Sequence, residues 1–238
     1  MLRSPEVNEL YSSGLHQGVS GIEEGTRTLS QEKSLKAVAS FDWYFKQKLF
    51  IQALGYVHPV SDFIFLEPQN EFRLTIRGAF PVFIYKQTDA LIYGTDFLLS
   101  FEPKENVKWL FKYAFVKGED RSGNRPLVNI PANNLFSSLT WSFKDSDKFK
   151  RNSFSVTGKY VFEQKNLLVE QDFLPPPDAY FLLGLNAETN WQFGHNPLRI
   201  SLTVENLLNT KYRDYLNRLR YFADEPGINF VLGLNYEF

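Results

Sequence analysis

The stretch that decides the fold is Ile228-Asn229-Phe230-Val231-Leu232-Gly233-Leu234-Asn235-Tyr236-Glu237-Phe238. Every even position carries an apolar or aromatic residue, and four of the odd positions carry Asn, Gly or Glu. In a β-strand, this period of two separates the two sets onto opposite faces. A tilted strand crosses the hydrocarbon of a bilayer with about 9 to 11 residues. The stretch therefore predicts a membrane-spanning β-strand with one lipid-facing side.

The composition of the whole chain fits this interpretation. The 238 residues include 23 Phe and 12 Tyr, which brings the aromatic content to 16%. No run of 18 apolar residues occurs, so a closed β-barrel is the remaining way to cross a membrane. The absence of cysteine fits an oxidising compartment. A net charge of −1 without a basic stripe argues against nucleic acid as a partner.

The same alternation recurs upstream of the final strand. Its clearest example places Val107, Trp109, Phe111, Tyr113 and Phe115 on one face. A sandwich or a soluble barrel gives the same alternation with its apolar face inward. Aromatic residues at strand ends, such as Tyr160 with Phe162, favour a lipid interface. We expect about nine strands, at 32–47, 49–60, 82–102, 107–115, 135–143, 154–162, 181–191, 198–204 and 228–238.

The connections between these strands alternate in length. Short ones are expected at 46–48, 103–106, 145–152 and 194–197, and long ones at 61–80, 117–133, 164–178 and 210–227. Short periplasmic turns and long extracellular loops are the outer-membrane arrangement. Bacterial single-chain barrels have an even number of strands, so nine indicates a partial barrel. A strand missed within 61–80 would make ten.

Two segments resemble one known family. Residues 204–227, VENLLNTKYRDYLNRLRYFADEPG, followed by the final strand, are similar to the C-terminal end of TonB-dependent outer-membrane receptors. Residues 3–18, RSPEVNELYSSGLHQG, resemble a segment from the middle of the barrel in the same family, and the likeness continues through Gly25, Leu29, Glu32 and Ser34. The two segments occur in the family's order, so the resemblance extends over essentially the whole chain.

The resemblance implies an all-β fold, an antiparallel transmembrane β-barrel of 22 strands, of which this chain would supply the last nine or ten. The family's N-terminal signal, TonB-contacting box and plug domain have no counterpart here, and residues 1–6 lack the apolar segment of a secretory signal. Residues 1–31 would form a long extracellular loop segment, and residues 32–238 the strands with their turns and loops.

The resemblance also implies a function. The complete receptor would import a scarce ligand, such as a siderophore, a vitamin or a saccharide, and would be neither an enzyme nor dependent on a cofactor. Its partners would be outer-membrane lipid, the barrel-assembly machinery, the imported small molecule and, through the absent plug region only, TonB. Because gating in the family depends on the plug, we expect this chain not to transport by itself.

Two groups of polar residues are candidate contact sites. The first lies in the last long loop and could contact an anionic or polar ligand, or could pair internally with Asp214, Asp224 and Glu225. It comprises Arg213, Tyr215, Arg218, Arg220 and Tyr221. The second should point into the lumen, where it could contact a plug or form an ordinary polar wall. It comprises Lys159, Glu188, Arg199 and Glu205.

The final strand is a candidate assembly signal. Its apolar face could be read by the barrel-assembly machinery through strand addition, or could simply face lipid. That face comprises Phe230, Leu232, Leu234, Tyr236 and Phe238. If its barrel partner is missing, the strand is an unsatisfied edge, and the chain alone is expected to aggregate.

Metal binding and catalysis find little support in the sequence. His16, His58 and His195 lack partners at the spacing of a metal pair, so no metal site is expected. A ten-stranded outer-membrane protease would need His58 close to Asp62 and Asp89. A soluble ligand-binding barrel would instead bury Trp109, Trp141 and Trp191 inside.

Overall fold

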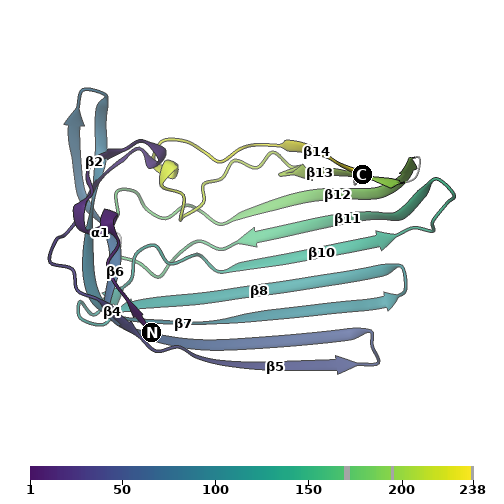
Figure 1. The fold of residues 1–238 in the computed structure, drawn as a ribbon, viewed down its shortest axis with the longest axis horizontal. Coiled ribbons are helices and arrows are strands. Elements are labelled where there is room, and N and C mark those ends of the chain that lie inside the picture. Colours follow the sequence, from purple (N-terminus) through teal and green to yellow (C-terminus); the bar gives the residue numbers. More distant parts are fainter. Residues whose placement is uncertain (169–171, 194–195, 237–238) are drawn as a thin grey trace.

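The computed structural model describes residues 1–168, 172–193 and 196–236. These residues form one 14-stranded sheet with short helices at its edge (Figure 1). Nine of the described strands have eight or more residues and lie side by side in chain order, each antiparallel to the next. They are β5 (Ala37–Phe45), β6 (Leu49–Thr75), β7 (Gly78–Lys104), β8 (Val107–Asp120), β10 (Asn134–Ser142), β11 (Phe149–Val161), β12 (Tyr180–Phe193), β13 (Asn196–Glu205) and β14 (Asn229–Tyr236). The predicted antiparallel fold of about nine strands is confirmed.

The remaining elements are short and lie mostly near the N-terminus. They are β1 (Leu2–Arg3), α1 (Val7–Tyr11), β2 (Ser13–His16), the 3-10 helix η1 (Gln17–Val19), β3 (Gly21–Glu24), β4 (Glu32–Ser34), β9 (Arg125–Pro126) and the 3-10 helix η3 (Arg218–Tyr221). β3 runs parallel to β7 over three residue pairs, whereas its other neighbour, β2, is antiparallel. None of the helices in the described part of the chain has the length and apolar character to cross a bilayer.

The connections gather at two ends of the sheet. Residues 1–36, the connections 121–133 and 206–228, and the described residues of the connection 162–179 lie at one end, which we call the loop end (left in Figure 1). Short connections lie at the opposite turn end. In the first of them, Lys46 and Gln47 have φ of 48° and 55°, and the amide of Lys48 donates to the carbonyl of Phe45 over 3.0 Å. Two consecutive residues with positive φ match the right-handed twist of the flanking strands, so the turn joins them tightly.

The predicted long loop at 61–80 is wrong, and no additional strand lies there. β6 and β7 instead continue as one hairpin to a tip at Ile76 and Arg77. Register shifts interrupt the pairing after Val60 and again after Pro68. The first irregularity adds one residue to β6 and reverses which face its following side chains occupy, and the second adds two residues, so the regular ladder breaks although the strand does not. The hairpin consequently turns across the loop end of the sheet (Figure 1).

The predicted strand at 32–47 is divided into β4 and β5. Both pieces pair with β6, but the ladder is interrupted between the pair Ser34 and Val60 and the pair Ala37 and Val57. Pro59 of β6 lies in this gap, and its carbonyl accepts a hydrogen bond from the amide of Leu35 over 3.2 Å. Proline has no amide hydrogen to return, so the regular ladder is interrupted beside it.

The two faces of the sheet differ in chemistry. On the apolar face, Phe230 and Leu232 of β14 are each 65% exposed, and Phe41 of β5 is 61% exposed. The register aligns this face across the strands, as in Leu139 between Trp109 and Val156. An exposed apolar surface of this extent is typical of the lipid-facing side of a barrel wall.

The buried core lies at the loop end rather than within the sheet. Val60, Ala90, Leu127 and Ile130 are almost fully buried there and pack against Phe63, Ile92 and Val116. Four of these residues come from β6 and β7 and Val116 comes from β8, whereas Leu127 and Ile130 come from the connection after β9. The 121–133 connection is thereby fixed against the polar side of the sheet.

Candidate functional site: inner wall and loop end

The face opposite the apolar one carries polar side chains, and we call it the inner wall. Rows of hydroxyl and amide groups cross it, because the register aligns Ser155 with Asn186 and Asn186 with Thr203. The Nδ2 group of Asn186 donates to Oγ1 of Thr203 over 2.8 Å. These groups form a hydrogen-bonding surface.

The four predicted lumen residues all lie on the inner wall. Arg199 and Glu188 pair through Nη2 and Oε2 at 2.8 Å. Glu205 accepts a hydrogen bond from Nδ2 of Asn229 over 3.1 Å. For the ammonium group of Lys159, the described residues provide no hydrogen-bonding or ionic partner. Contact with a plug stays a prediction for all four.

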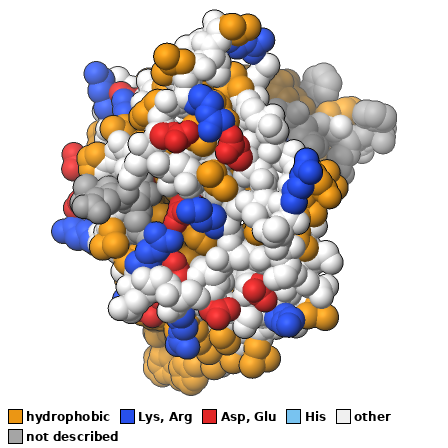
Figure 2. Space-filling view, turned by 90° about the vertical axis from the view of Figure 1, so that its left-hand side faces the viewer, with side chains coloured by type: hydrophobic (Ala, Val, Ile, Leu, Met, Phe, Trp, Pro, Cys, Tyr) orange, Lys and Arg blue, Asp and Glu red, His pale blue; other side chains and the backbone are white. Residues whose placement is uncertain are grey.

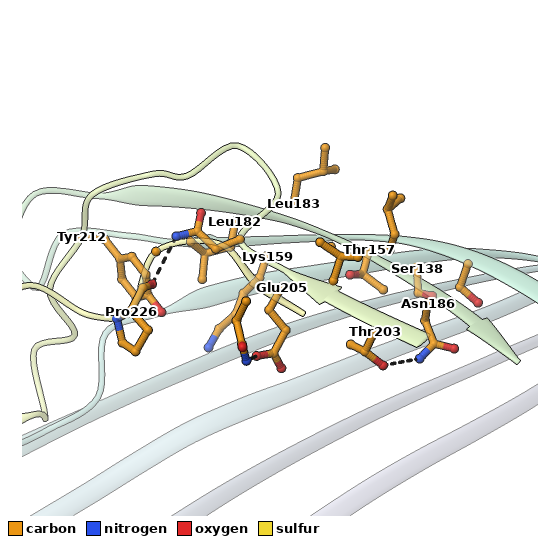
Figure 3. Close-up of a pocket in the computed structure, with 17 residues that line it drawn as sticks. Ser138, Thr157, Lys159, Leu182, Leu183, Asn186, Thr203, Glu205, Tyr212 and Pro226 are labelled. Atoms are coloured by element: carbon orange, nitrogen blue, oxygen red, sulfur yellow. Dashed lines mark hydrogen bonds between the residues drawn. The ribbon is translucent and has the colours of Figure 1, made fainter. Parts of the chain in front are cut away.

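A hollow of about 610 Å³ is recessed into the inner wall between β10 and the 206–228 connection. Figure 3 shows Lys159, Glu205 and Asn186 extending from the same side of the strands, while Leu183 points to the opposite side. The lining of the hollow combines hydroxyls, amides, one ammonium and one carboxylate with apolar side chains such as Leu182 and Pro226. The hollow can accept a polar partner through hydrogen bonds.

The 206–228 connection is anchored by two asparagines of the sequence motif. Asn206, which is 5% exposed, accepts from the amide of Thr210 over 2.8 Å and donates to the carbonyls of Thr210 and Pro226. Oδ1 of Asn209 accepts from the amide of Ile228 over 3.1 Å. The start and the end of the connection are thereby joined, which sets where β14 begins.

The arginines of the predicted ligand loop are all paired. Arg213 contacts Asp224 at 2.7 Å, and Arg220 contacts Asp172. Arg218 reaches Glu23 at 2.6 Å. Figure 2 looks onto the loop end and shows basic side chains lying next to acidic ones across it. Two of the three acidic partners lie outside the 206–228 connection, so the loop is bound to other segments as well as to itself.

The two tyrosines of this group are shielded from solvent. Tyr215 is 8% exposed, and the guanidinium of Arg220 lies 5.1 Å from its ring centroid. The hydroxyl of Tyr221 donates to Oδ1 of Asp172 over 2.5 Å. Burial and the charge of Asp172 raise the pKa of Tyr221 well above its ordinary value, so its hydroxyl keeps the proton it donates.

An aromatic cluster holds the bent hairpin against two other connections. Phe173 packs edge-on against Phe72 and Phe83 of the hairpin, with ring centroids 5.2 and 5.4 Å apart. Phe173 also meets Tyr221 at 5.5 Å, and the guanidinium of Arg218 lies 5.4 Å from the centroid of Phe83. Residues from the hairpin, from 162–179 and from 206–228 therefore meet in one cluster.

The N-terminal segment is bound to the same end of the sheet by charge. Arg3 contacts Glu9 at 3.0 Å and Glu32 at 2.6 Å, and Glu32 accepts from the amide of Ile64 over 2.7 Å. Burial acts to raise the pKa of Glu32, but hydrogen bonds from Arg3 and Ile64 hold it below its usual value. Glu23 shows the same balance, with Arg218 and His16 as its donors. Neither Glu23 nor Asp172 was recognisable from the sequence as a partner of the loop, because each is distant along the chain.

The structure also places most of the remaining residues singled out in the sequence, on the final strand and elsewhere. In β14, the side chains of Phe230, Leu232, Leu234 and Tyr236 lie on the apolar face, whereas Phe238 lies outside the described residues, as does His195. Trp109 is 39% exposed on that face, unlike the buried tryptophan of a soluble barrel. The amide of Asp62 donates to Asp89 over 3.2 Å, but among the described residues His58 hydrogen-bonds to neither. The described residues contain no group of three or more side chains able to hold a metal ion.

Comparison with solved structures supports the fold. The copper transporter OprC superposes with a TM-score of 0.77 at 22% identity, over 100% of this chain and 35% of its own. The ferric enterobactin receptor PfeA of Pseudomonas aeruginosa gives 0.64 at 16% identity, over 98% and 36%. The iron transporter FrpB of Neisseria meningitidis gives 0.62 at 15% identity, over 92% and 33%. The chain thus spans about a third of the length of these structures.

Comparison by sequence gives the family. No curated protein matches the chain. The family model described as "TonB dependent receptor-like, beta-barrel" matches residues 2–207, which is most of the chain. The match agrees with the antiparallel sheet, its apolar outer face and its polar inner wall. The chain belongs to the TonB-dependent receptor β-barrel family, whose members are outer-membrane receptors.

Proposed function

We propose that this chain forms the C-terminal barrel portion of an outer-membrane receptor that takes up a scarce ligand of the siderophore, vitamin or saccharide class. The observation that supports this most is the separation of an apolar outer face from a polar inner wall over nine consecutive strands, together with the family match. Of the similar structures, one is titled a ferric enterobactin receptor and another an iron transporter. Together with the copper transporter OprC, these titles support a metal or a metal chelate within the wider ligand class.

The proposed orientation places the turn end in the periplasm and the loop end outside the cell. Its support is the difference in connection length between the two ends. Residues 1–31 would then belong to the extracellular surface, where they pack on the β6–β7 hairpin through the pairing of β3 with β7. The strands and connections of 32–238 would make up the wall.

Transport requires more than the wall described here. As far as it is described, up to Tyr236, β14 pairs only with β13, and β5 pairs only with β6. The described sheet therefore has two free edges. An open sheet does not enclose a pore, and free edges in a bilayer leave backbone groups without partners. We therefore propose that these strands carry ligand only within a closed barrel, and that TonB acts through a plug region.

The candidate sites take different roles in this proposal. Arg213, whose side chain is 37% exposed, is the member of the loop group available to a ligand, while Tyr215, Arg218, Arg220 and Tyr221 hold the loop in place. Lys159 and Glu205 would meet the plug or passing ligand at the hollow. The apolar face of β14 would serve both as the lipid-facing surface and as the strand recognised by the barrel-assembly machinery.

Single-cysteine labelling tests the location and orientation together. The chain has no cysteine, so an introduced thiol is its sole labelling site. A membrane-impermeant maleimide on intact cells should label the Leu216→Cys variant in the 206–228 connection and not the Lys148→Cys variant at the turn end. Permeabilising the outer membrane should expose both thiols. Labelling of Lys148→Cys alone on intact cells would reverse the orientation, and recovery of both proteins in the soluble fraction would reject the function.

A further inference from the structure

One cross-strand row of the inner wall places an aromatic ring between two lysines. Phe136 of β10 pairs with Lys112 of β8 on one side and with Lys159 of β11 on the other. Residues directly opposite one another in an antiparallel ladder project from the same face, and neighbouring strands lie about 4.8 Å apart. The two lysines therefore start from backbones about 10 Å apart, with the ring between them.

The row projects from the inner wall and not from the apolar face. The ladders that join β10 to β8 and to β11 are regular from Asn134 to Trp141, so side chains two and four residues apart on β10 share a face. Phe136 therefore lies on the same side as Thr140, whose hydroxyl hydrogen-bonds with Ser155 on the inner wall. A ring at this position faces the lumen.

Both ammonium groups of the row lack a carboxylate partner in the described part of the chain. Nζ of Lys112 lies 5.9 Å from the ring centroid of Phe136, and the ammonium of Lys159 has no ionic or hydrogen-bonding partner there. Lys108, four residues before Lys112 on the same strand, instead contacts Glu102 at 3.0 Å. The row thus holds two positive charges that the described wall does not neutralise.

Hydroxyl groups lie next to the row on the side of the turn end. Ser138 pairs with Thr157, two residues along the strands from Phe136 and Lys159, and neither hydroxyl has a hydrogen-bond partner among the described residues. Both residues line the inner-wall hollow of about 610 Å³ together with Lys159 (Figure 3). Small-molecule sites have volumes of about 300 to 1,000 Å³. The hollow is therefore large enough for a small ligand group, which would meet cationic and hydroxyl donors in it.

We propose that this row binds an aromatic carboxylate group of the imported ligand on the lumen side of the wall. The ligand's ring would stack on Phe136, and its carboxylate would accept hydrogen bonds from the two ammonium groups and from the hydroxyls of Ser138 and Thr157. The choice of an anion rests on the two lysines that lack a carboxylate partner. The choice of a ring rests on the phenylalanine between them, which packs against no other aromatic ring of the described chain. The proposal rests on the proposed function, because the ligand has to enter the lumen.

Binding can be measured by saturation-transfer NMR on the protein extracted in detergent from outer membranes of cells that produce it. Benzoate is the probe and should bind, with detergent micelles alone as the blank. The Lys112→Gln/Lys159→Gln double variant should bind benzoate about fivefold more weakly, since exposed charge contacts are individually weak. The Lys104→Gln/Lys108→Gln control removes the same charge nearer the turn end and should bind as the parent protein does.

Two further probes test the charge and the ring separately. Benzamide keeps the ring without the charge, and cyclohexanecarboxylate keeps the charge without the aromatic ring. Each should bind about threefold or more weakly than benzoate, because each loses one of the two kinds of contact. Binding of benzamide equal to that of benzoate would overturn the anion, and equal binding of cyclohexanecarboxylate would indicate a site for any carboxylate, including one of a protein segment.

The remaining outcomes separate this site from the proposed function. Equal binding of benzoate by the parent and by the Lys112→Gln/Lys159→Gln variant would remove the two lysines from the site and overturn the proposal. The cysteine labelling described above reports on membrane location without any ligand. Absence of benzoate binding with correct labelling therefore rejects this site alone.

Discussion

Nη1 of Arg218 lies 2.6 Å from Oε1 of Glu23, which joins segments 195 residues apart in the chain. Glu23 belongs to β3, which pairs with β7 of the bent hairpin, and Arg218 begins the 3-10 helix of the 206–228 connection. The side chain of Glu23 is only 8% exposed. The pair therefore connects the first and last parts of the described chain at the loop end.

This pair should make the attachment of the hairpin dependent on pH. Hydrogen bonds from Arg218 and His16 outweigh burial and hold the pKa of Glu23 below its usual value. A depressed folded-state pKa contributes stability that is present above the unfolded value, about 4.3, and is lost as the pH falls through the folded value. The protection of residues 78–88 against hydrogen exchange, measured relative to the intrinsic exchange rate at each pH, should fall below about pH 4. The Glu23→Gln variant should exchange faster than the parent already at pH 7.

The Glu71→Gln variant is a matched control, because it removes a carboxylate from the same end of the sheet without breaking the pair of Glu23 and Arg218. Glu71 lies on the same hairpin and contacts Arg73 at 3.1 Å, but both side chains are about half exposed. The Glu71→Gln variant should change the exchange rates by less than about fivefold, the value for about 1 kcal/mol. If Glu71→Gln and Glu23→Gln accelerate exchange equally, the specific connection between the hairpin and the last loop is wrong.

Breaking the buried pair of Arg220 and Asp172 should release the 206–228 connection. The two side chains are 3% and 6% exposed, and removing one partner of a buried pair costs about 3 to 5 kcal/mol because the other charge remains. The Asp172→Asn variant should therefore become sensitive to protease within 206–228. The Asp224→Asn variant, which affects the more exposed pair with Arg213, should stay close to the parent. Resistance of Asp172→Asn at the parent level would contradict the structural role of the pair.

Asn206 should contribute to stability through its side-chain amide. Its substitution by Ala removes one accepted and two donated hydrogen bonds and leaves the amide of Thr210 unsatisfied. We expect a loss of about 1 to 3 kcal/mol in the free energy of unfolding, measured by urea titration in detergent or lipid. Asn235 lies exposed on β14 and serves as the control, because its substitution by Ala should cost less than about 0.5 kcal/mol. Equal losses for the two variants would reject the anchoring role.

A lysine at two neighbouring positions of β10 should affect membrane insertion differently. Leu139 lies on the apolar face, and Thr140 lies on the inner wall, where its hydroxyl hydrogen-bonds with Ser155 at 2.8 Å. Lysine on a lipid-facing position near the middle of the bilayer costs about 2 to 4 kcal/mol, whereas the inner wall is polar. Leu139→Lys should lower the yield of membrane-inserted protein, and Thr140→Lys should leave it nearly unchanged. The reverse order would assign the apolar face to the interior, as in a soluble barrel.

Most of the strands could be predicted from the sequence, because each keeps one alternation from end to end. Val107 to Phe115 is such a case, and it lies within β8 as expected. The hairpin beyond Val60 escaped prediction, since the bulge after Val60 reverses the alternation and Pro68 and Asn70, at the second register shift, resemble turn signals. The arginines of the last loop were recognisable, but their partners Glu23 and Asp172 are brought near only by the folded sheet.

Because the β6–β7 hairpin is longer than a membrane crossing, an insertion at its tip and an insertion in the wall below it have different effects. Each strand has 27 residues, whereas a crossing of the bilayer uses about 9 to 11, so the greater part of the hairpin stands clear of the membrane. At the tip, Leu74 is 84% exposed and Ile76 is fully exposed. Adding a residue to both strands at the tip lengthens the arm and preserves every pair below it. Insertion of a single residue in one strand below Val60 would instead exchange the lipid-facing and inner side chains of that strand. The arm can thus diverge between relatives in length while the wall beneath it stays in register.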